Sequence, residues 1–337
     1  MGMLDGRVAL VTGAGRGIGR GISLLLAQEG AKVVVNDLGV SLDGEGIDTG
    51  PAASVVEEIK AMGGEAIANT DSVTDHEAAR NMVQSAVDTW GRFDILCNVA
   101  GILRDRMIFN MSEEEWKAVL AVHLKGTFNT SKWAALHWRE TRDFGRIINM
   151  SSNSALGAPG QPNYAAAKAG IIGLTLTCAA SLARYGVTAN AVMPSGATRM
   201  IDSIPRAVEA VAHTGKLPSE LAIGTEQDPD NVAPLVAYLA SEAGADISGH
   251  LFGSFGYKMV LMSQPKVVRT IKTDHRWTVE ELSEVVPKAF GPAFGEQVNR
   301  PGITADITAL PEGQWVDLGN GQRYWGSQLE AYGEMVW

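Results

Sequence analysis

Short runs of β-branched and apolar residues alternate with segments of helical periodicity between residues 4 and 255. The runs that predict buried strands are Arg7–Val11, Ala31–Val35, Phe93–Leu96, Arg146–Asn149 and Val187–Val192. The segments that predict helices are Ile18–Gln28, Ala52–Met62, Glu77–Trp90 and Ser112–Leu124. Regular strand–helix alternation is typical of a doubly wound parallel sheet with helices on both faces, so we predict an α/β fold.

The regular alternation of strand-like and helix-like segments ends near Gln264, and we place a domain boundary there. Residues 1–264 form the predicted α/β domain, and residues 265–337 form a C-terminal extension. One helix is predicted in the extension over Thr278–Val286, closed by Pro287. The extension also carries the aromatic residues Trp315, Tyr324, Trp325, Tyr332 and Trp337, which argue against a disordered linker. We therefore expect it to pack on the domain or on a neighbouring subunit.

Composition excludes several classes of protein. The formal net charge of -10 and the lack of a long Lys/Arg run argue against binding to nucleic acid or to an anionic membrane. Cys97 and Cys178 lie in apolar stretches and predict buried thiols, and no cluster of metal-ligating residues is visible. The most apolar stretch, Ile171–Ala183, is too short to span a bilayer, and Met1–Val11 does not resemble a signal peptide. We expect a soluble, cytoplasmic protein that needs no metal.

A glycine-rich turn, Thr12–Gly19, follows the first predicted strand and opens the first predicted helix. Gly13, Gly17 and Gly19 let the backbone turn tightly and approach a pyrophosphate, which a helix N-terminus stabilises. The spacing Gly-x-x-x-Gly-x-Gly differs from the commoner Gly-x-Gly-x-x-Gly, and a tight turn without a ligand is the alternative. The position between a strand and a helix favours a dinucleotide site.

Asp37 ends the second predicted strand. An acidic side chain there can accept hydrogen bonds from the adenine ribose and repels a 2′-phosphate, which favours NAD over NADP. Arg16, inside the glycine-rich turn, has the opposite effect, because its guanidinium can pair with that phosphate. We weigh Asp37 more heavily, since its charge would lie closer to the 2′ position. A plain turn residue at the end of a strand is the alternative.

Tyr164 and Lys168 are separated by one helical turn in an alanine-rich context, which places the phenol and the ammonium on one face. A nearby cation favours the phenolate, so we predict a phenol pKa below its usual value of about 10. A phenol tuned in this way can exchange a proton with an alcohol or a ketone. Taken alone, such a pair is more typical of a helix surface, and it gains meaning only beside the other motifs.

Four motifs occur together and in order, and through them the chain resembles the short-chain dehydrogenase/reductase family over residues 4–255. The motifs are Thr12–Gly19, Asn98–Gly101, Ser151–Ser152 and Tyr164–Lys168. The resemblance implies a single Rossmann-type domain that binds a nicotinamide cofactor. It implies Tyr164 as the catalytic acid/base, Lys168 as the residue that holds the nicotinamide ribose and lowers the phenol pKa, and a serine that hydrogen-bonds the substrate oxygen. The cofactor-binding residues that it implies are Gly13, Arg16, Gly17, Ile18, Gly19, Asp37, Asp71 (at the adenine), Ser72, Asn98, Ala100, Gly101, Tyr164, Lys168, Pro194 and Thr198.

Further segments are similar to the (3R)-hydroxyacyl-CoA dehydrogenase domain of peroxisomal multifunctional enzymes. They are Val35–Gly39, Gly101–Arg106, Val122–Gly126, Arg199–Met200 and Asn231–Val236. This similarity implies a stand-alone NAD-dependent oxidoreductase that interconverts a secondary alcohol and a ketone, with a 3-hydroxyacyl-CoA as the first candidate substrate. A steroid, another lipophilic alcohol or a small carbonyl compound is the second. A non-catalytic NAD-binding regulator is disfavoured, because Tyr164, Lys168 and a serine are all present.

Two positions depart from the family pattern, and the catalytic serine is open. His123 stands where the family has a catalytic Asn; it can hold a water in a proton relay and become charged as pH falls, or it can be a packing histidine. Pro194 is followed by serine rather than glycine. Counting back from Tyr164 by the family's usual separation gives Ser151, whereas counting forward from the preceding strand gives Ser152. A strand fixes its end more firmly than a loop fixes its length, so we prefer Ser152 and keep Ser151 as the alternative.

Small residues line the predicted helix after Tyr164, from Ala165 to Ala183, and permit close helix packing. Members of the family commonly pair through this helix. We therefore expect a homodimer or a homotetramer, with packing on the protein's own sheet as the alternative use of these residues.

Overall fold

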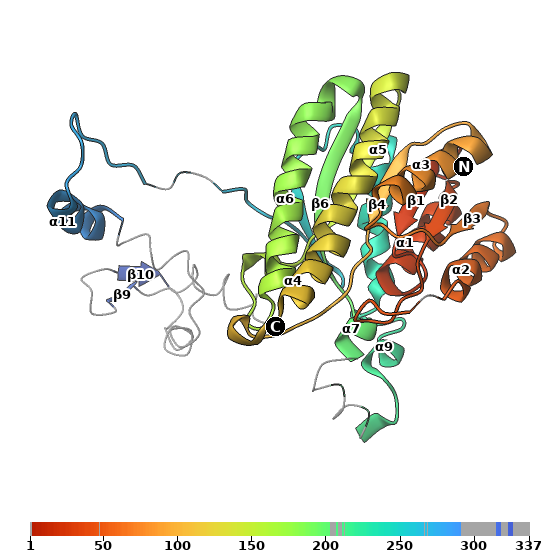
Figure 1. Ribbon diagram of the computed structural model, residues 1–337, viewed down its shortest axis with the longest axis horizontal. Coiled ribbons are helices and arrows are strands. Elements are labelled where there is room, and N and C mark those ends of the chain that lie inside the picture. The colour runs from red at the N-terminus through yellow and green to blue at the C-terminus, as the bar shows by residue number, and fades with distance from the viewer. Residues whose placement is uncertain are drawn as a thin grey trace. The chain divides into compact units, whose positions relative to one another are not determined.

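The computed structural model describes residues 2–46, 48–202, 207, 211, 213–265, 267, 269–290, 315–317 and 323–325. The chain divides into two compact units, Met1–Gln264 and Pro265–Trp337. The first unit contains an eight-stranded sheet with the strand order β3-β2-β1-β4-β5-β6-β7-β8 (Figure 1). The predicted α/β fold with a doubly wound sheet is confirmed.

The central strands of the sheet agree with the predicted runs to within a few residues. The strands are β1 (Val8–Thr12), β2 (Lys32–Asn36), β3 (Ala66–Asn69), β4 (Ile95–Asn98), β5 (Gly145–Met150), β6 (Val187–Ser195), β7 (Leu251–Phe255) and β8 (Lys258–Leu261). Neighbouring strands are parallel, except that β8 pairs antiparallel with β7. The β2–β1–β4 region is therefore the place where the chain reverses the direction in which it adds strands.

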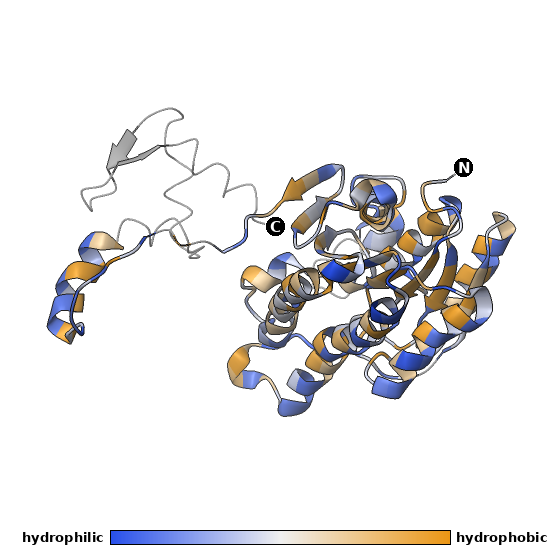
Figure 2. Ribbon diagram, turned by 90° about the horizontal axis from the view of Figure 1, so that it is seen from above, coloured by the Kyte–Doolittle hydropathy of each residue, from blue (hydrophilic) through white to orange (hydrophobic). Residues whose placement is uncertain are grey.

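Nine helices of this unit are described. They are α1 (Gly17–Gln28), α2 (Gly50–Ala61), α3 (His76–Trp90), α4 (Glu113–Leu120), α5 (Gly126–Thr141), α6 (Pro162–Leu182), α7 (Arg199–Asp202), α9 (Pro218–Leu221) and α10 (Ala233–Ala240). α1, α2 and α10 cover one face of the sheet, and α3, α5 and α6 cover the other. In Figure 2 the strands are largely hydrophobic, as expected for a sheet that is buried on both faces.

Side chains alternate between the two faces along each strand. In β1, Ala9 and Val11 pack with the residues of α1, α2 and α10, whereas Val8 and Leu10 pack with those of α3, α5 and α6. This period of two gives the sheet two separate hydrophobic layers. The layers leave the carboxyl ends of the strands and the loops after them free to build a site.

The helix predicted over Ser112–Leu124 is part of a longer helical segment. Ser112 caps α4 with a capping box to Glu115, as the pattern of an N-terminal serine predicts. The residues Ala121–Lys125 then form a π-helical turn, and α5 follows without a break. A π-helical turn inserts an extra residue into the helix and often accompanies a functional site.

The helix α6 is longer than the apolar stretch Ile171–Ala183 considered from the sequence. Together with the turn that follows it, the segment Pro162–Tyr185 is long and apolar enough, by length and composition alone, to cross a bilayer. The expectation of too short a stretch is therefore wrong for this helix. In the structure α6 packs along β6 and beside α4 and α5 (Figure 1), and 28% of its apolar window is buried.

In the second unit the structure describes a helix and a pair of short strands. α11 runs over Val279–Ala289 and begins with the predicted capping box at Thr278. Pro287 lies inside this helix rather than closing it, so that expectation is wrong; the amide of Phe290 donates to the carbonyl of Val286, and the last turn closes around the proline. β9 (Trp315–Asp317) and β10 (Arg323–Trp325) pair antiparallel. The packing predicted for the aromatic side chains of the extension lies outside the described residues.

Candidate active site

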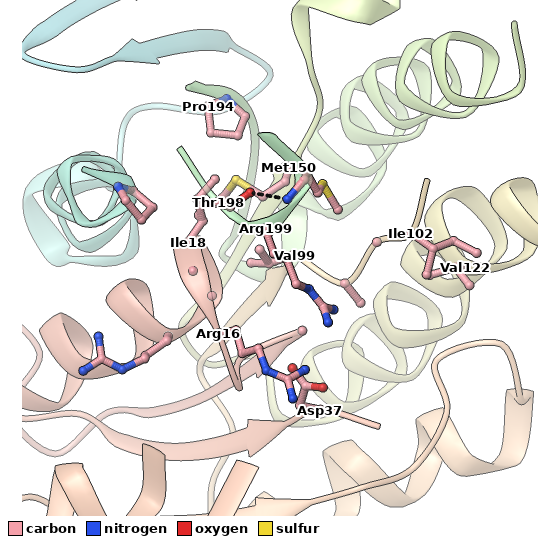
Figure 3. A pocket seen from close by; sticks show the side chains of 18 of the residues that line it. Arg16, Ile18, Asp37, Val99, Ile102, Val122, Met150, Pro194, Thr198 and Arg199 are labelled. Atoms are coloured by element: carbon pink, nitrogen blue, oxygen red, sulfur yellow. Dashed lines mark hydrogen bonds between the residues drawn. The ribbon is translucent and has the colours of Figure 1, made fainter. Parts of the chain in front are cut away.

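A cavity of about 800 Å³ lies at the carboxyl ends of the strands, next to the turn between β1 and α1. This is the place where an open α/β sheet forms a crevice, because the connections on its two sides leave in opposite directions. Figure 3 shows side chains of the wall. The predicted site residues in that wall are Gly13, Arg16, Gly17, Ile18, Gly19, Asp37, Asp71, Ser72, Ala100, Gly101, His123, Ser151, Tyr164, Lys168, Pro194 and Thr198.

The turn between β1 and α1 leaves no room for side chains at two of its glycines. Gly13 has a φ of +65°, and a Cβ there would lie 2.7 Å from the Cα of Ala100. A Cβ on Gly19 would lie 2.1 Å from the carbonyl oxygen of Gly13. Among the described residues no side chain caps the N-terminus of α1, and its first turn has no acidic residue. This glycine cradle and the open amides fit the pyrophosphate of a dinucleotide.

Asp37 follows β2 and ties two loops to the cavity wall. One carboxylate oxygen accepts the N–H of Gly15 at 2.8 Å, and the other accepts the N–H of Gly39 at 2.7 Å. The glycine pattern in the sequence missed Gly15, where a Cβ would lie 2.8 Å from Oδ2 of Asp37. Arg16 lies beside Asp37 in Figure 3, and its guanidinium is 3.8 Å from the carboxylate of Asp48.

Two serines follow β5, and they have different partners. The Ser152 hydroxyl acts on the phenol of Tyr164, whose pKa it lowers, and its oxygen accepts the backbone N–H of Ser154 at 3.2 Å. The Ser151 hydroxyl is buried and donates to the carbonyl oxygen of Lys168 at 3.0 Å. The structure therefore brings Ser152, rather than Ser151, to the phenol, whereas Ser151, and not Ser152, lines the cavity.

Burial dominates the ionisation of the Tyr164–Lys168 pair. It raises the pKa of Tyr164 to about 12, while Ser152 opposes this shift. It lowers the pKa of Lys168 to about 7, and the ammonium donates to the carbonyl oxygen of Met150 at 2.6 Å. The predicted lowering of the phenol pKa is not found. The reason is that the cost of burying a phenolate outweighs its attraction to the Lys168 ammonium, whose Nζ lies 5.5 Å from the ring centroid.

His123, in the π-helical turn, is braced against the backbone after β4. Its Nε2 is 2.8 Å from the carbonyl oxygen of Ile102 and 3.1 Å from the amide nitrogen of the same residue. Its buried Nδ1 has no partner among the described residues, and its ring packs edge-on against Tyr164 with the centroids 5.0 Å apart. Burial and the charge of Lys168 lower the pKa of His123 to about 3. The expectation that it becomes charged as pH falls is therefore wrong near neutral pH.

Asn98 lies in the interior rather than in the cavity wall. Its Nδ2 donates to Oδ1 of Asn149 at 2.9 Å, and its Oδ1 accepts the hydroxyl of Thr130 at 2.7 Å. These bonds join β4 to β5 and to α5 beneath the site. The next residues of the same motif, Ala100 and Gly101, do line the cavity.

Arg199 and the loop after β2 form a part of the site that the predicted site residues do not include, although Arg199–Met200 is among the segments of family similarity. The guanidinium of Arg199 donates to the carbonyl oxygen of Val40 at 3.0 Å, and both residues line the cavity. The same loop is held from the other side, where the N–H of Leu103 donates to the carbonyl of Leu42 at 3.1 Å. Its position in the sequence could have identified Arg199 as a site residue, because it follows Thr198 just beyond the carboxyl end of β6. Ligand-binding side chains gather at the carboxyl ends of such strands.

Known proteins are similar to this chain over most of its length. The family described as short chain dehydrogenase matches residues 7–207. A hydroxyacyl-CoA dehydrogenase from Mycobacterium tuberculosis is 41% identical over 307 residues, which cover 87% of this chain and 92% of that protein. A peroxisomal multifunctional enzyme type 2 from Drosophila melanogaster is 42% identical over 284 residues, and the match covers 83% of this chain but only 44% of that enzyme. The crystal structure of a short chain dehydrogenase from Mycobacterium avium shares 44% identity and a TM-score of 0.74, over 89% of this chain and 98% of that one.

Proposed function

The chain belongs to the short-chain dehydrogenase family and is an oxidoreductase, and from this premise we propose that it interconverts a 3-hydroxyacyl-CoA and the corresponding 3-ketoacyl-CoA with NAD. The observation that carries the proposal is that Tyr164 and Lys168 line the same cavity as the glycine cradle. A proton donor and acceptor thus lies in the same cavity as a site for the dinucleotide.

The residues of the site have separate tasks in this reaction. A bound nicotinamide supplies or accepts the hydride. Tyr164 is protonated near neutral pH, since its pKa is about 12, and donates its proton to the oxygen of a ketone. Ser152 orients that oxygen: the N–H of Ser154 holds the serine oxygen, and the hydroxyl proton turns from the phenol to the ketone oxygen when substrate binds. Lys168 stabilises the phenolate that forms, and it assists the removal of the alcohol proton in the reverse direction.

Two observations support a lipophilic acyl substrate. The relative from Mycobacterium tuberculosis, 92% of whose length is covered by the match, is named a hydroxyacyl-CoA dehydrogenase. Apolar side chains are also exposed on the segments that follow β4 and β5. Met107, Ile108, Phe109 and Leu156 are exposed by 45%, 74%, 76% and 64% respectively. Exposed apolar side chains are suited to an apolar ligand.

The carboxylate of Asp37 supports NAD as the preferred cofactor. It is fixed at the wall by two backbone amides, and it would repel a 2′-phosphate. Arg16 could attract that phosphate, but the carboxylate of Asp48 at 3.8 Å offsets part of its charge. We therefore assign the lower preference to NADP.

We further propose a cytoplasmic homodimer or homotetramer. The support for assembly is the outer face of α6, where the exposed residues Ala166, Gly173 and Ala180 recur at helical spacing. A Cβ added to Gly173 would meet nothing within 4 Å, so the face is open to another helix. The molar mass from light scattering tests the assembly, and a mass equal to one chain would contradict it.

A substrate panel tests the proposed function. The purified protein is mixed with 3-hydroxyacyl-CoAs of short and long chain length, with a steroid alcohol or with a small secondary alcohol, each with NAD and with NADP. The absorbance of the reduced nicotinamide is followed. We expect the highest kcat/KM for a 3-hydroxyacyl-CoA with NAD. A higher kcat/KM for the steroid or the small alcohol would replace the substrate class, and no turnover of any compound would overturn the function.

A further inference from the structure

The segment Gly101–Arg106 after β4 runs beside the loop between β5 and α6. The N–H of Arg106 donates to the carbonyl oxygen of Gly160 at 2.7 Å. Nδ2 of Asn163 donates to the carbonyl oxygen of Arg104 at 3.0 Å, directly before Tyr164 in the chain. These two bonds hold the segment against the start of the catalytic helix. The sequence motif in this segment has no part in the mechanism described above.

A chain of hydrogen bonds leads from Asp105 in this segment to the catalytic serine. Nε2 of Gln161 donates to Oδ2 of Asp105 at 2.6 Å. Oε1 of the same amide accepts the hydroxyl of Ser154 at 2.8 Å, and the N–H of Ser154 donates to Oγ of Ser152 at 3.2 Å. Every step joins groups within normal hydrogen-bond distance.

Asp105 sets the direction of the two side-chain bonds in this chain, whereas the backbone N–H of Ser154 always donates to Ser152. An ionised carboxylate can only accept, so Asp105 requires the NH₂ group of Gln161 to face it. The amide oxygen must then face Ser154, whose hydroxyl becomes the donor. Asp105 is close enough to act on the site directly as well, because its charge adds to the effect of burial in raising the pKa of Tyr164.

We propose that Asp105 is a positioning residue, which fixes the oxygen of Ser152 against Tyr164 through Gln161 and Ser154. The proposal rests on the proposed function only for its kinetic readout. Asp105 does not touch the cavity wall, and it acts through the 3-10 turn Asn153–Leu156 that carries Ser154. Without it, the amide of Gln161 loses its fixed orientation and the turn loses the anchor on its far side.

Four variants of the full chain test the proposal: Asp105→Ala, Asp105→Asn, Gln161→Ala and the double variant Asp105→Ala/Gln161→Ala. The matched control is Asp88→Ala, because Asp88 accepts a 2.8 Å bond from Gln84 on the surface of α3, away from the site. We measure kcat, KM for substrate, the dissociation constant of NADH and the thermal midpoint. NADH binding and the thermal midpoint establish that each variant is folded.

We expect Asp105→Ala and Gln161→Ala each to lower kcat by about 10- to 100-fold, the loss associated with a catalytic group displaced by about 1 Å. NADH binding should change less than about twofold, since the glycine cradle is untouched. The double variant should be no slower than either single one, because both act in one chain. Asp105→Asn should recover most of kcat, since its amide oxygen can still accept from Gln161.

Three results would overturn the proposal: kcat of Asp105→Ala equal to that of Asp88→Ala, additive losses in the double variant, or an Asp105→Asn variant as slow as Asp105→Ala. If the unaltered protein turns over no substrate, the proposed function fails instead. Crystal structures of the unaltered protein and Asp105→Ala then decide the matter. An unmoved Ser152 hydroxyl would overturn the positioning role, and a displaced one would support it.

Discussion

The proposed preference for NAD over NADP depends on the carboxylate of Asp37, and Asp37→Asn tests it. The substitution removes the charge but keeps an oxygen that can accept the N–H of Gly15 or the N–H of Gly39. The other amide loses its partner, and both nucleotides should be weakened alike by that loss. The ratio between NADP and NAD should change separately, because only NADP carries the 2′-phosphate that the charge repels.

The size of the change follows from Coulomb's law at the cavity wall. Two unit charges 4 Å apart interact by about 1 kcal/mol in water and by about 4 kcal/mol at an effective dielectric constant of 20. Asp37 is 9% exposed, which places the site between these limits. We expect roughly 1–3 kcal/mol, which is about a 5- to 150-fold rise in the NADP/NAD ratio of kcat/KM.

The assay measures kcat/KM for both nucleotides in the unaltered protein, in Asp37→Asn and in Asp43→Asn. Asp43 is the control, because its exposed carboxylate in the same loop accepts a hydrogen bond from Ser41 rather than from the glycine-rich turn. Equal shifts in both variants would mean that only the overall charge of the loop matters. An unaltered protein that already prefers NADP would refute the reasoning and make Arg16 the dominant residue.

Three further predictions follow from the site and the extension. Ser152→Ala should lower kcat far more than Ser151→Ala, because Ser152 meets the phenol and Ser151 bonds the Lys168 carbonyl; kinetics that place the larger loss at Ser151 would reverse the assignment. Lys168→Met should raise the thermal midpoint most below pH 7, where the folded state buries a charged Lys168. This difference in thermal midpoint between the variant and the unaltered protein should shrink as pH rises from 7 towards 10.5, because in that range Lys168 binds a proton only in the unfolded chain. A difference that grows with pH would contradict the lowered pKa of Lys168. Truncation after Gln264 should change substrate preference or molar mass while NAD still binds, whereas unchanged kinetics and mass would make the extension a passive appendage.

The parts of the fold that sequence patterns predict well are those with strong local signals. β1 and β2 are continuous apolar runs, and Ser112 and Thr278 begin their helices with capping boxes. β3 is the short sequence Ala-Ile-Ala-Asn, which has no clear strand signal, and it forms because β2 offers an edge to pair with. α5 has a weak apolar face, and its continuity with α4 depends on a π-helical turn that no local pattern marks.

The site shows the same division between local and non-local causes. The glycine cradle, Asp37 and the Tyr164–Lys168 pair are local motifs, and the structure places them around one cavity. The pKa of Tyr164 is set by burial, which depends on all the segments that pack around it, so a pairwise argument with Lys168 had the wrong sign. His123 is similar: its neutral state depends on burial beside Lys168, which the sequence does not display.

The most direct test of the account compares the unaltered protein with Tyr164→Phe. Formation of NADH from a 3-hydroxyacyl-CoA is followed by absorbance, and NADH binding is followed by fluorescence. The substitution removes one hydroxyl and leaves the ring that packs against His123. We predict a loss of about 10²- to 10⁴-fold in kcat, the usual contribution of a positioned acid/base, with NADH binding nearly unchanged. Turnover close to that of the unaltered protein would contradict the central claim that Tyr164 transfers the proton.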